Sequence, residues 1–267
     1  MRLPIEDVLP DLLAALREQG QAVLQAPPGA GKTTRVPLAL HEAGLITGTI
    51  LMLEPRRLAA RGAAERMAQT LGEKVGQTVG YRMRGDSKVG SDTRIEVITE
   101  GILTRRLQTD PELVGVGAVI FDEFHERALT ADFGLALCLE IREALREDLT
   151  LLVMSATLDA APVAALMGAP IVTAEGRSYP VDITWLPRPR PKGQWLEEGV
   201  TELTAQALAE TDGSVLVFLP GEAEIRRVEA RLSKRLPPGA SLHPLFGALP
   251  FAAQQAAIAP AATGRKV

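Results

Sequence analysis

Short apolar runs alternate with amphipathic stretches along most of the chain. Between the runs the apolar residues recur with helical spacing, most clearly over 57–71 and 131–145. Repeated strand–helix units predict an α/β fold in which a parallel sheet carries helices on both faces. Ligands of such sheets bind at the carboxyl ends of the strands. Six runs have the length and composition of buried strands: 22–25, 49–53, 77–81, 94–98, 118–121 and 149–154.

A proline-rich segment divides the pattern in two. Residues 185–193 (WLPRPRPKG) hold three prolines and three positive charges, which predicts a loop or linker. We therefore expect one α/β domain over 1–177 and the start of a second, incomplete one over 178–267. In the second part the expected helices are 196–209, 222–235 and 250–259, and the expected strands are 214–219 and 242–246.

A glycine-rich loop lies between the first predicted strand and the next helix. Residues 26–34 read APPGAGKTT, the P-loop pattern with alanine in place of the first glycine. Gly29 and Gly31 allow backbone N–H groups to turn toward an oxyanion, and the following helix adds its positive end. Lys32 supplies a charge for the β- and γ-phosphates, and the Thr33 hydroxyl can bind Mg²⁺. The predicted ATP·Mg²⁺-binding residues are Pro28, Gly29, Ala30, Gly31, Lys32, Thr33 and Thr34.

An acidic sequence follows the apolar strand predicted over 118–121. Residues 122–127 read DEFHER. Asp122 can hold Mg²⁺ through its water shell, and Glu123 can orient or deprotonate an attacking water. A solvated acidic turn is the alternative, and it is common after strands. The P-loop upstream favours the chemical interpretation, because Mg²⁺-nucleotide chemistry needs both groups.

These two motifs, with four others in order, resemble those of a known family. DEFHER resembles the DEAH box of superfamily 2 helicases, with phenylalanine in place of alanine. Residues 54–60 resemble motif Ia, 99–101 motif Ib, 155–157 motif III and 217–221 motif IV. The sequences DEFHER, LEPRRLAA and FLPGEAEI are most similar to those of bacterial HrpB-type helicases.

The resemblance implies a nucleotide-driven motor made of two RecA-like domains. ATP would lie between the domains, RNA would lie across both, and hydrolysis would drive their relative motion. It implies phosphate and Mg²⁺ contacts for Lys32, Thr33 and Asp122, and the catalytic role for Glu123. His125 would couple the site to the second domain.

The same resemblance implies contacts to the base of ATP and to nucleic acid. Arg66 would stack on adenine, while Ser155 and Thr157 would link hydrolysis to unwinding. Read without the resemblance, these two hydroxyls could equally cap a helix near Asp159. The predicted contacts to the nucleic-acid backbone are Arg56, Arg57, Thr99 and Gly101. The alternatives for these four are surface arginines that open a helix, and a helix cap with a turn.

Composition limits how nucleic acid is held. The net charge is −4 and aromatic residues make up 4% of the chain, so neither bulk electrostatics nor extensive base stacking is expected. We expect RNA, or DNA, to be bound mainly through its backbone. Residues 81–84 (YRMR) could stack a base, or could form a half-exposed strand face.

Other features favour a cytoplasmic protein without membrane spans. The N-terminus meets acidic residues at once, and no apolar run approaches the roughly 18 residues that a span needs. The single cysteine, Cys138, lies in an apolar stretch and predicts a small buried side chain.

The family pattern is incomplete in one respect. Residues 265–267 resemble the first residues of motif V, and no arginine-rich QRxGRxGR motif occurs. We therefore expect this polypeptide alone to bind ATP·Mg²⁺ but to hydrolyse it poorly and not to unwind. Two other functions compete with that of a DEAH-type RNA helicase. One is a nucleotide-dependent RNA clamp without efficient turnover, and the other is a P-loop ATPase that acts on DNA or protein.

Overall fold

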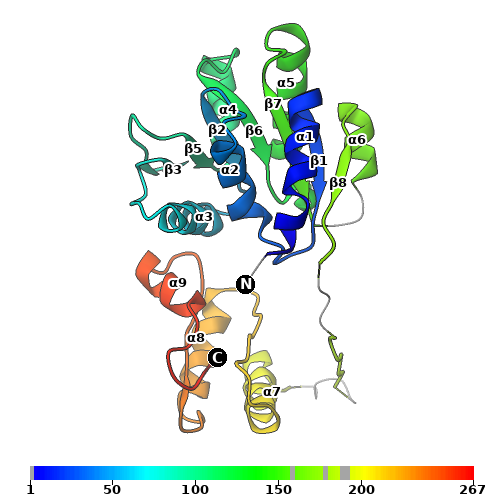
Figure 1. Cartoon of the computed structure of the whole chain (residues 1–267). Helices are drawn as coiled ribbons and strands as arrows, with labels where there is room; N and C mark the ends of the chain where they lie inside the picture. The colour runs from blue at the N-terminus through cyan, green and yellow to red at the C-terminus, as the bar shows by residue number, and fades with distance from the viewer. Residues whose placement is uncertain (1–2, 157–159, 177–179, 187–192) are drawn as a thin grey trace. The chain divides into compact units, whose positions relative to one another are not determined.

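The chain forms two compact α/β units. The computed structural model describes residues 3–156, 160–176, 180–186 and 193–267. Unit 1 is Met1–Pro180 and unit 2 is Val181–Val267. Both are drawn in Figure 1. In the part of the chain that the structure describes, no helix is both long and apolar enough to cross a membrane.

Unit 1 is built on an eight-stranded sheet with the order β4-β3-β5-β2-β6-β7-β1-β8. Every pairing is parallel except β3 with β4, which is antiparallel. The strands are β1 (Gln21–Gln25), β2 (Thr49–Leu53), β3 (Val79–Met83), β4 (Asp86–Lys88), β5 (Ile95–Ile98), β6 (Val116–Phe121), β7 (Thr150–Ser155) and β8 (Ile171–Thr173).

Helices cover both faces of this sheet (Figure 1). One apolar cluster joins the sheet to α1, α2 and α3, and a second joins its other face to α4, α5 and α6. The central strands β2, β6 and β7 are buried along almost their whole length, because helices lie above and below them. The helices are α1 (Leu9–Gln19), α2 (Lys32–Glu42), α3 (Arg57–Thr70), α4 (Glu100–Thr109), α5 (Leu129–Ala144) and α6 (Ala161–Met167), with short 3₁₀ turns η1 (Pro4–Asp7) and η2 (Phe124–Glu126).

The predicted α/β class and parallel sheet are confirmed in unit 1. The strand expected over 49–53 matches β2 at both ends, and the helix expected over 57–71 differs from α3 by one residue. The strand expected over 77–81 is shifted by two residues in β3. The short strands β4 and β8 were not predicted, because three residues carry too little pattern to distinguish a strand from a loop. Cys138 is fully buried, as its apolar surroundings predicted.

Unit 2 contains the three expected helices, but the two expected strands are wrong. The helices are α7 (Leu196–Glu210), α8 (Glu222–Leu232) and α9 (Phe251–Ile258). Neither 214–219 nor 242–246 is a strand, and the only strand pair among the described residues of this unit is the short parallel one of β9 (Ala240–Ser241) with β10 (Arg265–Lys266).

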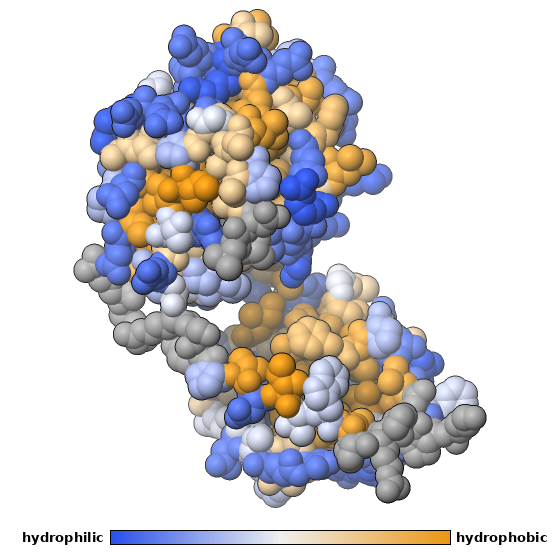
Figure 2. All heavy atoms as spheres, turned by 90° about the vertical axis from the view of Figure 1, so that its right-hand side faces the viewer, coloured by the Kyte–Doolittle hydropathy of each residue, from blue (hydrophilic) through white to orange (hydrophobic). Residues whose placement is uncertain are grey.

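A strand requires a neighbouring backbone as well as an apolar pattern. Among the described residues, one backbone–backbone hydrogen bond, from Val215 N–H to the Lys266 carbonyl, ties 214–219 to a neighbouring segment, and the Ser214 hydroxyl accepts the Lys266 N–H. Leu216 and Phe218 are 75% and 86% exposed. Apolar atoms accordingly come to the surface of unit 2 (Figure 2). Most of the predicted linker, 187–192, lies outside the described residues.

Candidate nucleotide-binding site and nucleic-acid face

The P-loop connects the carboxyl end of β1 to the first residue of α2. Gly29 (φ 78°) and Gly31 (φ 95°) both adopt the left-handed conformation, which glycine reaches without steric cost. Gly31 occupies the N-cap position, and its carbonyl accepts the Arg35 N–H at 2.9 Å, so the helix begins immediately after the turn. The first N–H groups of a helix lack acceptors within the helix. Among the described residues, only the Thr34 N–H of the first three in α2 has a backbone acceptor, the Gly31 carbonyl at 3.3 Å. The loop therefore presents N–H donors and a positive helix end, as anion binding requires.

Lys32 is the first residue of α2 and is buried. Its side chain is 4% exposed, and its Nζ lies 2.9 Å from Glu123 Oε1. A buried ammonium is stable only with a charged or polar partner. The structure therefore joins the lysine of the P-loop directly to the acidic sequence that follows β6, although ninety residues of sequence separate them.

Asp122 lies at the tip of β6 and is 4% exposed. Its Oδ1 accepts the Glu123 N–H at 2.8 Å, and the Thr33 hydroxyl also donates to its carboxylate. Burial raises the pKa of Asp122 to about 6. Among the described residues, its Oδ2 has no hydrogen-bond partner. A buried carboxylate oxygen without a donor, beside the Thr33 hydroxyl, fits a hard cation such as Mg²⁺.

The described residues include no cluster of three or more His, Cys, Asp or Glu side chains that could hold a metal. A cation at Asp122 and Thr33 would therefore take its remaining ligands from phosphate oxygens and water. This is the coordination that Mg²⁺ commonly adopts in nucleotide sites.

A second buried carboxyl group, that of Glu54, lies beside Asp122. Leu53 of β2 pairs with Phe121 of β6, so the residues that follow them emerge next to each other. Burial and, secondly, the neighbouring Asp122 charge together raise the pKa of Glu54 to about 8, while a hydrogen bond from Arg56 N–H lowers it. Two adjacent buried carboxylates repel each other, so a proton on one of them stabilises the pair. Glu54 is the group with the higher pKa.

His125 lies between Glu123 and the end of β7. Its Nδ1 is 3.3 Å from Ala156 N and 3.4 Å from Glu123 Oε2. As a neutral acceptor Nδ1 receives the Ala156 N–H; as a protonated donor it binds Glu123, and it cannot do both. Ser155 is the last residue of β7 and is buried. Helix α6 takes Ala160 as its N-cap residue, so Ser155 does not cap it.

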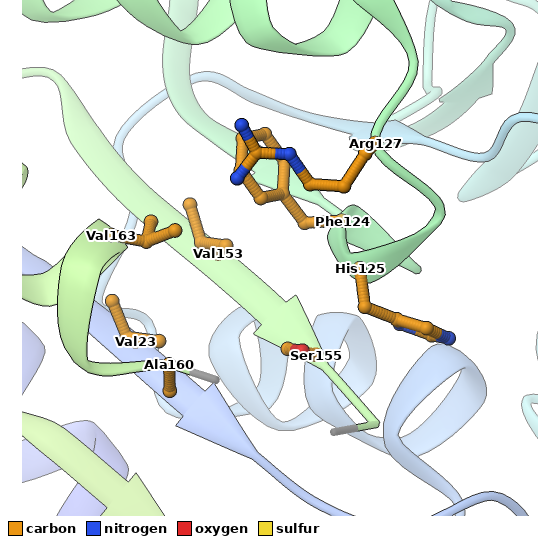
Figure 3. Close-up of a pocket in the computed structure, with 8 residues that line it drawn as sticks. All are labelled: Val23, Phe124, His125, Arg127, Val153, Ser155, Ala160 and Val163. Carbon is orange, nitrogen blue, oxygen red and sulfur yellow. The ribbon is translucent and has the colours of Figure 1, made fainter. Parts of the chain in front are cut away.

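Phe124, the residue that replaces alanine in the DEAH-like sequence, anchors the acidic turn. Its ring packs edge-to-face on Phe121 with centroids 6.1 Å apart, and the Arg127 guanidinium lies 5.7 Å from its centroid. Figure 3 shows Phe124 and Arg127 on one side of a cavity, with Val153 and Val163 opposite. The cavity measures about 70 Å³, too small for a nucleotide, since ligand pockets usually exceed about 300 Å³. Lys32 and Asp122 do not line it.

The predicted nucleic-acid contacts lie after β2 and β5, which are adjacent in the sheet. Arg56 and Arg57 follow β2, where Arg56 is the N-cap residue of α3, and both are exposed. Thr99 is the N-cap residue of α4, but its side chain makes no capping hydrogen bond. Gly101 is exposed in the first turn of α4, with open space where a Cβ would be. The structure therefore places these four residues on the same side of the sheet as the P-loop, at the carboxyl ends of the parallel strands.

Three further predictions have different outcomes. Arg66 is exposed on α3, as a residue that stacks on a base must be. Tyr81 is 3% exposed, and Arg61 lies over its ring, so it cannot stack a base. In the same strand Arg82 forms an ion pair with Glu96 at 2.6 Å. Thr157 lies outside the described residues.

A comparison with protein-family models matches residues 6–166 to the DEAD/DEAH box helicase model. This match covers more than half of the chain. The chain belongs to the DEAD/DEAH box helicase family. The matched region contains the P-loop, the acidic sequence and the strands β1, β6 and β7 that carry them.

Relatives in this family extend well beyond the matched region. The ATP-dependent RNA helicase HrpB of Escherichia coli is 52% identical over 99% of this chain, which covers 33% of that protein. The ATP-dependent RNA helicase HrpA homolog of Haemophilus influenzae is 33% identical over 99% of this chain and 20% of its own length. A crystal structure of the Escherichia coli DEAH/RHA helicase HrpB superposes with a TM-score of 0.93 over 99% of this chain and 34% of that one. The chain thus spans about a third or less of these relatives.

Two acidic residues in these helicase motifs received no role from the sequence. Glu54 directly follows a strand that is apolar at nearly every position, as Asp122 does, and that shared position was the available signal. Glu126 lies within DEFHER, but its partner, Arg56, is 70 residues away in the chain. Only the arrangement of β2 beside β6 brings them together.

Proposed function

We propose that this chain is the nucleotide-binding part of an ATP-dependent RNA helicase of the DEAH type, which couples ATP hydrolysis to translocation or unwinding of nucleic acid. The observation that carries the proposal is the convergence of Lys32, Asp122 and Glu123. The lysine proposed to bind phosphate, the carboxylate proposed to bind metal and the proposed base lie near one another at the carboxyl ends of the strands. The family match and the names of the relatives support the same activity.

The proposed chemistry assigns one task to each group. The P-loop N–H groups and Lys32 bind the phosphates, and Lys32 leaves Glu123 to do so. Mg²⁺, when bound with the nucleotide, neutralises phosphate charge. Thr33 and Asp122 hold that cation from the protein side. Glu123, released from Lys32, orients the attacking water and accepts its proton.

The proposed nucleic-acid face consists of Arg56, Arg57, Thr99 and Gly101. The exposed arginines and the Thr99 hydroxyl, which makes no capping hydrogen bond, are suited to bind phosphate oxygens. Phosphate contacts carry no sequence information. RNA is proposed over DNA because the curated relatives are named RNA helicases. Arg66 is proposed to stack on the adenine ring, and Ser155 with Thr157 to link hydrolysis to unwinding.

Unit 2 is proposed to be the beginning of a second RecA-like domain, with the boundary near residue 178. Its helices and the parallel pair of β9 with β10 support an α/β arrangement. His125 is proposed to couple the nucleotide site to this domain. Weak hydrolysis by the 267-residue chain alone and a cytoplasmic location stay predictions.

A binding experiment with two variants tests the proposal. Fluorescent ATP with Mg²⁺ and a labelled single-stranded oligouridine are titrated separately into the wild-type chain, Lys32→Ala and the exposed-lysine control Lys74→Ala. We expect Lys32→Ala to weaken ATP binding at least tenfold and Lys74→Ala to change it little. Equal ATP affinity in the two variants would contradict the proposed nucleotide site.

Single-turnover hydrolysis with and without RNA separates the competing functions. Acceleration by oligouridine supports the helicase motor. Tight ATP-dependent RNA binding with no acceleration supports the clamp. A stronger response to oligodeoxythymidine of the same length supports a DNA-directed ATPase.

A further inference from the structure

An ion pair joins the proposed nucleic-acid face to the acidic turn of the nucleotide site. Arg56 Nη2 lies 2.6 Å from Glu126 Oε1. Arg56 is the N-cap residue of α3, three positions after the end of β2. Glu126 is the last residue of η2, three positions after Glu123. A residue proposed to contact phosphate therefore forms an ion pair with a carboxylate from the acidic sequence DEFHER.

The pair is placed where an incoming phosphate can replace the carboxylate. The Arg56 side chain is 71% exposed. Exposed ion pairs contribute little to stability, so they exchange partners readily. A phosphate offers the guanidinium the same paired oxygen acceptors as a carboxylate. A phosphate bound at Arg56 would also repel the Glu126 charge, so the two anions compete for one cation.

The turn that carries Glu126 is short and strained. Glu123 (φ 49°) and Arg127 (φ 53°) both lie in the left-handed region, which costs energy for residues other than glycine. The Glu126 N–H donates to the Glu123 carbonyl at 2.9 Å, and Phe124 anchors the turn on Phe121. A change at Glu126 therefore reaches Glu123 through one hydrogen bond and through two intervening residues that have little freedom to absorb it.

We propose that Glu126 competes with nucleic acid for Arg56. A nucleic-acid phosphate displaces Glu126 from Arg56, and this exchange changes the conformation of the turn that holds Glu123. Binding of nucleic acid at Arg56 thereby alters the nucleotide site within unit 1. The inference rests on the proposed function, because it takes Arg56 to be a phosphate contact. A purely structural role for the pair predicts the opposite response to its removal, since loss of a support loosens the face that binds RNA.

Oligouridine affinity of matched variants tests the competition. Glu126→Gln removes the competing charge and keeps the shape. We expect it to bind oligouridine about two- to fivefold more tightly than wild type, the range that release of an exposed ion pair allows. Arg56→Ala should bind more weakly, with a smaller dependence of affinity on salt. The double variant should match Arg56→Ala, because without Arg56 there is nothing for Glu126 to compete for.

Glu42→Gln is the control for the loss of one negative charge. Glu42 pairs with Arg35 at 2.9 Å, so this variant also removes one exposed glutamate from an arginine. It lies at the far end of α2, about 15 Å along the helix from Lys32. Glu126→Gln must tighten binding more than Glu42→Gln does. Thermal melting confirms folding, and Glu126→Ala repeats the test if the glutamine variant is unfolded.

The coupling to Glu123 has its own readout. Oligouridine is added at saturation, and the change in the affinity for fluorescent ATP is compared between wild type and Glu126→Gln. We expect a smaller change in ATP affinity in Glu126→Gln, because its turn is no longer held by the ion pair with Arg56. An affinity for oligouridine equal to or below that of Glu42→Gln overturns the competition, even where Arg56→Ala weakens binding and the proposed function stands. Equal binding by wild type and Arg56→Ala instead removes the proposed RNA contact itself.

Discussion

The ammonium group of Lys32 lies 2.9 Å from the carboxylate of Glu123. The cation proposed for the phosphates and the base proposed for the water therefore neutralise each other. Phosphate binding must separate them, since Lys32 cannot serve both anions fully. The same event that fills the site would then free Glu123 to act as a base.

Glu123→Gln should separate binding from hydrolysis. Removing the carboxylate leaves Lys32 without its competing partner, so affinity for ATP·Mg²⁺ should rise severalfold. Hydrolysis should slow by about 100-fold or more, the usual contribution of a general base. Fluorescent ATP titration and single-turnover hydrolysis measure the two effects.

Glu112→Gln is the matched control for Glu123→Gln, because Glu112 is an exposed glutamate of the same unit. It should alter neither quantity. If Glu123 were only the structural partner of Lys32, hydrolysis in Glu123→Gln would fall no further than a change in ATP affinity explains. That result would assign the base to another group.

The sequence was sufficient where structure depends on neighbours in the chain. Strand β2 has apolar residues at nearly every position, because both its faces are buried, and its limits could be predicted without error. The P-loop and DEFHER are also local patterns. The segment 214–219 has similar apolar character, but whether it becomes a strand depends on a partner backbone elsewhere, which no local pattern specifies.

The electrostatics of the site depend on sheet order and register. Glu54 is adjacent to Asp122 because Leu53 pairs with Phe121, and Arg56 reaches Glu126 for the same reason. Neither the order β2-β6-β7-β1 nor this register could be predicted from the spacing of the motifs. The site was therefore predictable as a list of groups proposed to bind phosphate and metal. The interactions among those groups were not.

Gly101 and Gly62 form a pair that separates a binding role from a helical one. Both lie in helices, and a Cβ on either would meet nothing within 4 Å. Alanine at each should stabilise the fold by roughly 0.5–1 kcal/mol, since glycine is unfavourable in helices. Only Gly101→Ala should weaken oligouridine binding, by at least about threefold, because a methyl group there blocks close approach of a phosphate to the backbone.

Urea denaturation and oligouridine titration of the two glycine variants check this prediction. If Gly101→Ala gains stability and binds oligouridine as tightly as Gly62→Ala does, Gly101 serves only the first turn of α4. The proposed nucleic-acid face would then lose one of its four members.

Glu54→Gln should remove part of the pH dependence of stability. The pKa of Glu54 is raised from 4.5 to about 8, first by burial and then by the Asp122 charge. Between these values the folded chain holds a proton that the unfolded chain has released. The free energy of unfolding must therefore fall as the pH rises toward 8, by at most about 1.4 kcal/mol per pH unit. Above pH 8 both states are ionised at this position and the slope ends.

Asp122 contributes in the same direction, but only up to about pH 6. The range from pH 6 to 8 therefore isolates Glu54. Glutamine imitates the protonated carboxyl group and can still accept the Arg56 N–H. We expect the urea midpoint of Glu54→Gln to stay nearly constant across this range, while that of wild type and of the exposed control Glu42→Gln falls. An equal fall in all three would mean that Glu54 is ionised in the folded chain at pH 6, and that some other contact keeps two adjacent buried carboxylates stable.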